Sequence, residues 1–75
     1  MTLAQILTPR QMEVVKCVSE GCSNQEIGTK LGVSRYTAKL HLQRIYERVG
    51  YGRYGKGSSR EPRILLAIRY DREAR

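Results

Sequence analysis

The chain has 75 residues, is 40% hydrophobic and carries a formal charge of +7 at pH 7. A chain of this length forms one small domain that buries only about 60% of its unfolded surface, which excludes a two-domain cleft and a deep substrate cavity. No apolar run approaches the roughly 20 residues of a membrane span, and the first ten residues do not read as a signal peptide. We therefore expect a cytoplasmic protein with no membrane partner.

The first predicted helix begins at Pro9. Thr8 is a favourable N-cap, proline suits the first helical position, and Gln11 stands where a capping box places its glutamine. Apolar residues then recur at helical spacing until Gly21, which is expected to end the helix.

Two further helices follow with a short connection between them. Ser23 and Glu26 form a capping box that starts a short helix, and Gly32 closes it. Ser34 caps the next helix, predicted over 35–49. Because only residues 32–34 separate the two helices, the sequence predicts an angled helix-turn-helix.

The remaining part of the chain divides into a loop and a last helix. Residues 51–61 are rich in glycine, tyrosine and basic residues and are expected to form the loop, while 62–72 are expected to be helical. Ile64, Leu65 and Ile68 make the last helix apolar around more of its circumference than one small core covers. These three residues are the predicted homodimer interface.

The positive charge lies entirely in the second half of the chain. Residues 1–34 contain three basic and three acidic groups, whereas residues 35–75 contain eleven basic and four acidic groups. This asymmetry favours a polyanion-binding face.

The helix predicted over 35–49 carries the candidate contacts. Its core stripe consists of Ala38, Leu42, Ile45 and Val49. The opposite side presents the candidate base contacts Lys39, Leu40, Gln43 and Tyr36. Lysine donates to guanine, glutamine pairs with adenine, and leucine contacts the thymine methyl group, so this face suits the major groove. An ordinary solvated face is the alternative interpretation.

A second set of residues is expected to contact the phosphate backbone, which fixes register without reading sequence. On the helix these are Arg35, Thr37, Arg44 and Arg48. In the loop they are Arg53 and Lys56, against the alternative of a flexible solvated linker.

The motifs taken together resemble the LuxR/GerE-type helix-turn-helix domain. The matching segments are Leu7-Thr8-Pro9-Arg10, residues 20–27, Leu31-Gly32-Val33-Ser34, residues 38–41 and Arg48-Val49-Gly50. They follow the family order without gaps over 7–50, about 60% of the chain. The resemblance implies an all-α, four-helix DNA-binding domain of a bacterial transcription regulator, whose third helix reads the major groove. It also places Asn24 near the DNA backbone.

Three functions are compared on this basis. The leading prediction is a sequence-specific regulator that binds double-stranded DNA as a homodimer. We expect it to be a stand-alone regulator, since no sensing segment precedes residue 7. A larger regulator or RNA polymerase is a further candidate partner. The first alternative is an interaction protein that pairs with larger relatives through Leu66 and Tyr70 of the last helix and antagonises them. The second is a basic RNA-binding module, which its few stacking aromatics disfavour.

The sequence gives no indication of catalysis or of a cofactor. No nucleophile–base pair is evident, and the single histidine, His41, lies beside the core stripe. Cys17 and Cys22 are the only cysteines and are expected to be small buried hydrophobic residues. A closed zinc site needs about four ligands, so no metal site is predicted. No small-molecule ligand and no enzymatic activity are predicted either.

Overall fold

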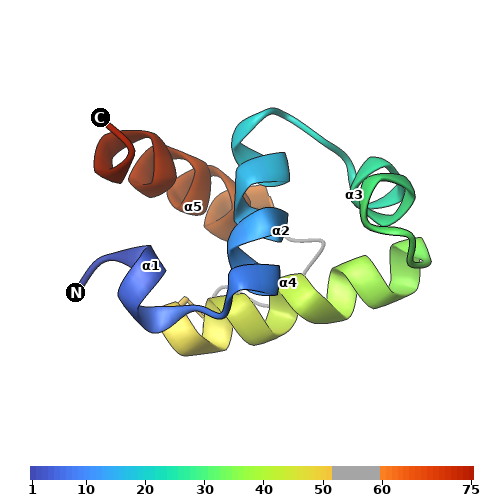
Figure 1. The fold of residues 1–75 in the computed structure, drawn as a ribbon, viewed down its shortest axis with the longest axis horizontal. Helices are drawn as coiled ribbons and strands as arrows, with labels where there is room; N and C mark the ends of the chain where they lie inside the picture. The colour runs from blue at the N-terminus through green and yellow to red at the C-terminus, as the bar shows by residue number, and fades with distance from the viewer. Residues whose placement is uncertain (52–59) are drawn as a thin grey trace.

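The computed structural model describes residues 1–51 and 60–75, and its regular structure there is entirely helical (Figure 1). The helices are α1 (Leu3–Ile6), α2 (Pro9–Ser19), α3 (Asn24–Leu31), α4 (Arg35–Val49) and α5 (Arg60–Glu73). The all-α fold is therefore confirmed, and α3 and α4 form the helix-turn-helix. The short α1 was not predicted from the sequence.

Local capping interactions set the beginnings of α2 and α3 as predicted. The Thr8 hydroxyl accepts from the backbone N–H of Gln11 at 3.1 Å, and the Gln11 side chain accepts from the Thr8 N–H at 3.0 Å. Ser23 and Glu26 repeat this exchange at 3.2 and 2.8 Å. The hydrogen bond from the Ser23 backbone, above all, lowers the pKa of the Glu26 carboxyl.

The buried face of α4 is the centre of the core. Ala38, Leu42 and Ile45 are fully buried, as the helical spacing predicts. Val49 is only partly buried, whereas Tyr46, which is not part of the predicted core stripe, is fully buried. The apolar side of α4 is therefore rotated slightly toward Tyr46. Residues of the other helices pack around this apolar side.

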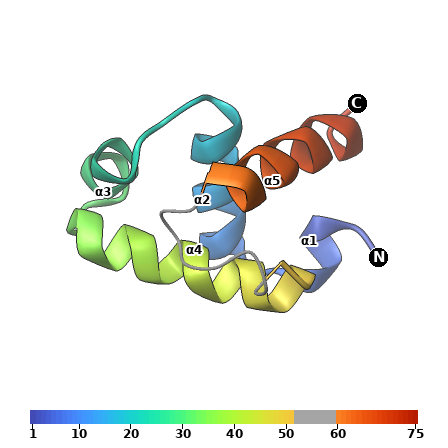
Figure 2. The ribbon, with the colours of Figure 1, turned by 180° about the vertical axis from the view of Figure 1, so that it is seen from behind.

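The other helices are arranged around α4 and α2. In Figures 1 and 2, α4 runs along one side of the molecule, α3 lies over its beginning, and α5 packs against α2. The turn between α3 and α4 comes very close to Gly28, since a Cβ atom there would lie 2.6 Å from the Val33 carbonyl oxygen. Glycine at this position permits the close approach of the two helices.

The last helix has one buried and one exposed apolar side. Leu66 is fully buried against the core, whereas Ile64 and Ile68 are 49% and 51% exposed. The interpretation that larger relatives pair through Leu66 requires this residue to be exposed, and it is wrong for Leu66 because the side chain is buried in the core. Tyr70 is partly buried. Within the described residues, none of the helices has the length and apolar character of a membrane span.

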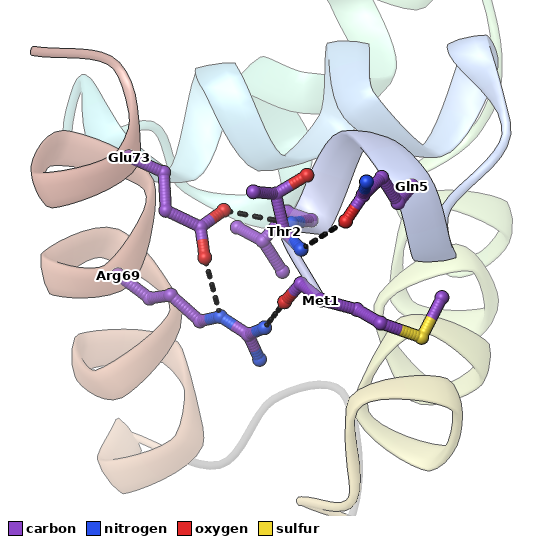
Figure 3. Close-up of polar contacts among 6 residues, drawn as sticks. Met1, Thr2, Gln5, Arg69 and Glu73 are labelled. Atoms are coloured by element: carbon purple, nitrogen blue, oxygen red, sulfur yellow. Dashed lines mark hydrogen bonds and ion pairs between the residues drawn. The ribbon is translucent and has the colours of Figure 1, made fainter.

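A polar cluster joins α1 to the end of α5 (Figure 3). One Glu73 carboxylate oxygen accepts from the Leu3 N–H at 2.7 Å, and the other accepts from Arg69 Nε at 2.9 Å. Arg69 also donates to the Met1 carbonyl oxygen at 2.5 Å. The Leu3 N–H, and to a smaller extent Arg69, lower the pKa of the Glu73 carboxyl.

Substituting Glu73 should make the free energy of unfolding depend less on pH in the acidic range. Because the folded-state pKa lies below the unfolded value, this stabilisation is present above the ordinary glutamate pKa and is lost as pH falls through the folded-state pKa. We expect Glu73→Gln to lower the free energy of unfolding by about 1 kcal/mol at pH 7 and by much less at pH 3. Urea denaturation measures both values, with exposed Asp71→Asn as control. Equal losses of unfolding free energy at the two pH values would contradict the stabilising role of the ionised Glu73 carboxylate.

Candidate nucleic-acid interface

The outer side of α4 lies outside the core. Tyr36 is 65% exposed, while Lys39, Leu40 and Gln43 are partly exposed and none of them is buried. The N-cap Ser34 accepts from the Thr37 N–H at 3.0 Å and fixes the beginning of the helix that carries them. The four predicted base contacts are therefore held on one rigid helix and remain accessible to a ligand.

The beginnings of α3, α4 and α5 together form a surface hollow of about 700 Å³. It is lined by Ser23, Asn24, Gln25, Arg35, Tyr36, Lys39 and Arg63. Four of these residues are predicted DNA contacts: Asn24, Arg35, Tyr36 and Lys39. The three cationic side chains of the lining, together with the N-terminal end of α3, make the hollow favourable for an anion.

Arg63 is the member of this hollow that the sequence did not indicate. Its guanidinium donates to the Asn24 side-chain oxygen at 2.6 Å and to the Cys22 carbonyl oxygen at 3.3 Å. Burial raises the pKa of the Tyr46 phenol, and the nearby Arg63 opposes this effect. Arg63 therefore connects the beginning of α5 to the beginning of α3 and to the buried Tyr46 of α4. No local motif marks this role, because the partners lie about 40 residues away along the chain.

The other predicted backbone contacts are distributed more widely. Arg44 is exposed on α4, and Thr37 is partly buried with its hydroxyl accepting from that of Ser34 at 3.1 Å. Arg48 is exposed but donates to the Ile6 carbonyl oxygen at 2.8 Å, so it already contributes to holding the N-terminal segment. Arg53 and Lys56 lie outside the described residues.

The predicted dimer residues lie on α5. Ile64 and Ile68 are separated by one helical turn and expose about half of their surface, and Leu65 beside them is partly buried. The apolar side of α5 is therefore only partly used by the core of the chain.

Comparison with known proteins gives a family match. A family model described as bacterial regulatory proteins, luxR family, matches residues 5–52, which run from the end of α1 through all of α2, α3 and α4. None of the solved structures compared gives a significant match.

Curated relatives carry names of the same kind. A candidate HTH-type transcriptional regulator of Mycobacterium tuberculosis is 46% identical over 44 residues, which are 59% of this chain and 5% of that protein. The HTH-type transcriptional regulator AlkS of Pseudomonas putida is 45% identical over 40 residues, 53% of this chain and 4% of AlkS. The probable transcriptional regulatory protein SgaR of Hyphomicrobium methylovorum is 36% identical over 44 residues, 59% of this chain and 21% of SgaR. The chain thus spans only a small part of the length of these relatives.

Removing the guanidinium of Arg63 should weaken the junction of α3 and α5. We expect Arg63→Met to lower the free energy of unfolding by about 1–2 kcal/mol, since partly buried acceptors on Cys22 and Asn24 lose their donor. Arg63→Lys, which keeps a donor and the charge, should cost less. Chemical denaturation compares both with Arg72→Met, an exposed control on the same helix. An Arg63→Met protein as stable as this control would contradict the assigned role.

Proposed function

The chain belongs to the luxR family of bacterial regulatory proteins, and we propose that it binds double-stranded DNA sequence-specifically through α4. The relatives that match it are named as transcriptional regulators, which supports the same class of function. The observation that carries the proposal is the division of α4 into two sides. One side is fully buried in the core, and the other presents a cationic and amide-bearing surface.

The chemistry of the outer side fits base edges in the major groove. Lys39 donates to guanine O6 or N7, and Gln43 pairs with the N6 and N7 positions of adenine. Leu40 contacts a thymine methyl group, and Tyr36 extends from the first turn of the same helix. Because α4 is rigidly packed, these side chains approach neighbouring base pairs in a fixed register.

The phosphate backbone is proposed to lie along the hollow at the beginning of α4. Arg35 and Arg63 supply charge there, and Asn24 stands at the N-terminal end of α3. Arg44 contributes from the exposed side of α4 farther along. Such contacts orient the protein on the duplex and make binding dependent on salt.

The functional unit is proposed to be a homodimer formed through α5. Ile64 and Ile68, each about half exposed, supply a compact apolar strip next to Leu65. A two-fold axis through this strip would place two copies of α4 on successive half-sites of a two-fold DNA sequence.

Substitutions on α4 should separate base reading from backbone binding. We expect Gln43→Ala to weaken binding to a DNA sequence obtained by in vitro selection by about 1–3 kcal/mol and to relax the preference at one base pair. Arg44→Ala should weaken selected and random DNA alike and reduce the magnitude of the salt slope by about one. Fluorescence anisotropy at several salt concentrations measures both effects.

Two results would contradict this division of roles. Equal losses on selected and random DNA would remove Gln43 from the base contacts. A wild-type chain that binds no duplex alone would favour the antagonist interpretation of the sequence instead.

A charge on the exposed strip of α5 should separate the dimer. We expect Ile68→Glu to keep its helical content and to sediment as a monomer, because a carboxylate would be buried in an apolar interface. The exposed variant Arg72→Glu is the control on the same helix and should sediment like the wild type. An Ile68→Glu protein with the sedimentation of the wild type would contradict the proposed interface.

A further inference from the structure

The C-terminal end of α2 brings the two cysteines of the chain together. Gly21 adopts a left-handed conformation with φ of +84°. Its N–H donates to the Val18 carbonyl oxygen at 3.0 Å, and the Cys22 N–H donates to the Cys17 carbonyl oxygen at 3.0 Å. These are the two hydrogen bonds of a Schellman motif, in which the side chains at the positions of Cys17 and Cys22 lie against each other.

Glu20, the C-cap residue of the same motif, adds a third ligand atom. One atom each from Cys17, Glu20 and Cys22 lies within 4.8 Å of the other two. The residues Cys17 and Cys22 are 7% and 8% exposed, whereas Glu20 is exposed, so the cluster is apolar on its inner side and accessible from solvent on the carboxylate side. The helix ending therefore preorganises two sulfur ligands and one oxygen ligand.

We propose that Cys17, Glu20 and Cys22 form a binding site for one soft divalent metal ion of the zinc class, with water as the fourth ligand. Thiolates select soft ions, and a shell of three protein ligands and one water is the arrangement of open zinc sites. A tetrahedral zinc ion holds its sulfur and oxygen ligands about 3.5–3.8 Å apart. Each pair of these atoms therefore needs to close by at most about 1.3 Å.

The spacing of the cysteines alone predicted no metal site, because a closed zinc shell wants four soft ligands. The structure changes this expectation by placing Glu20 beside the pair and by leaving one side accessible to water.

Lys30 is the cation that competes for this cluster. Its ammonium nitrogen lies 3.4 Å from a Glu20 carboxylate oxygen. A metal ion has to displace this ammonium group and the protons of the thiols. The Lys30 side chain is 54% exposed, so it can turn into solvent, and an exposed ion pair of this kind contributes little to stability.

The position of the cluster links it to the rest of the domain. Cys22 directly precedes the Ser23 cap of α3, and its carbonyl oxygen accepts from Arg63 of α5. An ion bound by Cys17 and Cys22 would therefore stiffen the corner where α2, α3 and α5 meet.

Cobalt provides a direct test. The reduced chain, kept in a reductant that contains no thiol, is titrated with Co²⁺ and then with Zn²⁺. We expect saturable binding of one Co²⁺ per chain, with thiolate charge-transfer absorption and the visible bands of a four-coordinate ion, followed by displacement by Zn²⁺. Absence of saturable binding, or one ion shared by two chains, would overturn the proposal.

Variants test the ligands Cys22 and Glu20 separately. Cys22→Ser should abolish the charge-transfer absorption, and Glu20→Gln should weaken binding by at least about tenfold while the thiolate absorption persists. Lys30→Gln should strengthen binding by up to about fivefold, since the competing charge is lost. Glu13→Gln, an exposed carboxylate on α2, is the matched control and should bind like the wild type. Because Glu20 is exposed and its substitution leaves the core intact, wild-type affinity in Glu20→Gln would overturn the three-ligand site even if Cys22→Ser failed to fold.

Discussion

The burial of one side of α4 is the constraint on which the rest of the structure depends. Ala38, Leu42, Ile45 and Tyr46 are fully buried, and each helix packed around them fixes the rotation of α4 about its axis. Burial of apolar side chains such as these is the main favourable contribution to folding. The same rotation decides which residues face outward. The exposure of Lys39 and Gln43, the proposed base contacts, is therefore a consequence of the packing of the opposite side.

Two contacts outside the apolar core refine this placement. Gly28 lets the turn before α4 approach α3 closely, and Arg63 holds the beginning of α5 against the beginning of α3. The surface hollow lies where these three helix beginnings meet. Its positive charge thus comes from elements separated along the sequence, and small changes in the packing of α5 would alter the proposed contact with the phosphate backbone.

The parts of the fold that sequence predicts well are the local ones. Thr8 with Gln11, and Ser23 with Glu26, specify helix beginnings through hydrogen bonds within four residues. The outer side of α4 follows from helical periodicity alone. The role of Arg63, the burial of Leu66 and the meeting of the cysteines with Glu20 depend on tertiary contacts or on side-chain placement at a helix end. The periodicity of apolar residues does not encode these contacts.

The most direct test of the account is an NMR titration of the chain with a duplex recovered by in vitro selection. If α4 contacts the bases, the largest backbone and side-chain shift changes will fall on its outer side, at Tyr36, Lys39, Leu40 and Gln43, and at the hollow beside it. Shift changes confined to other helices, with these four residues unaffected by a tightly bound duplex, would contradict the claim that α4 contacts the bases.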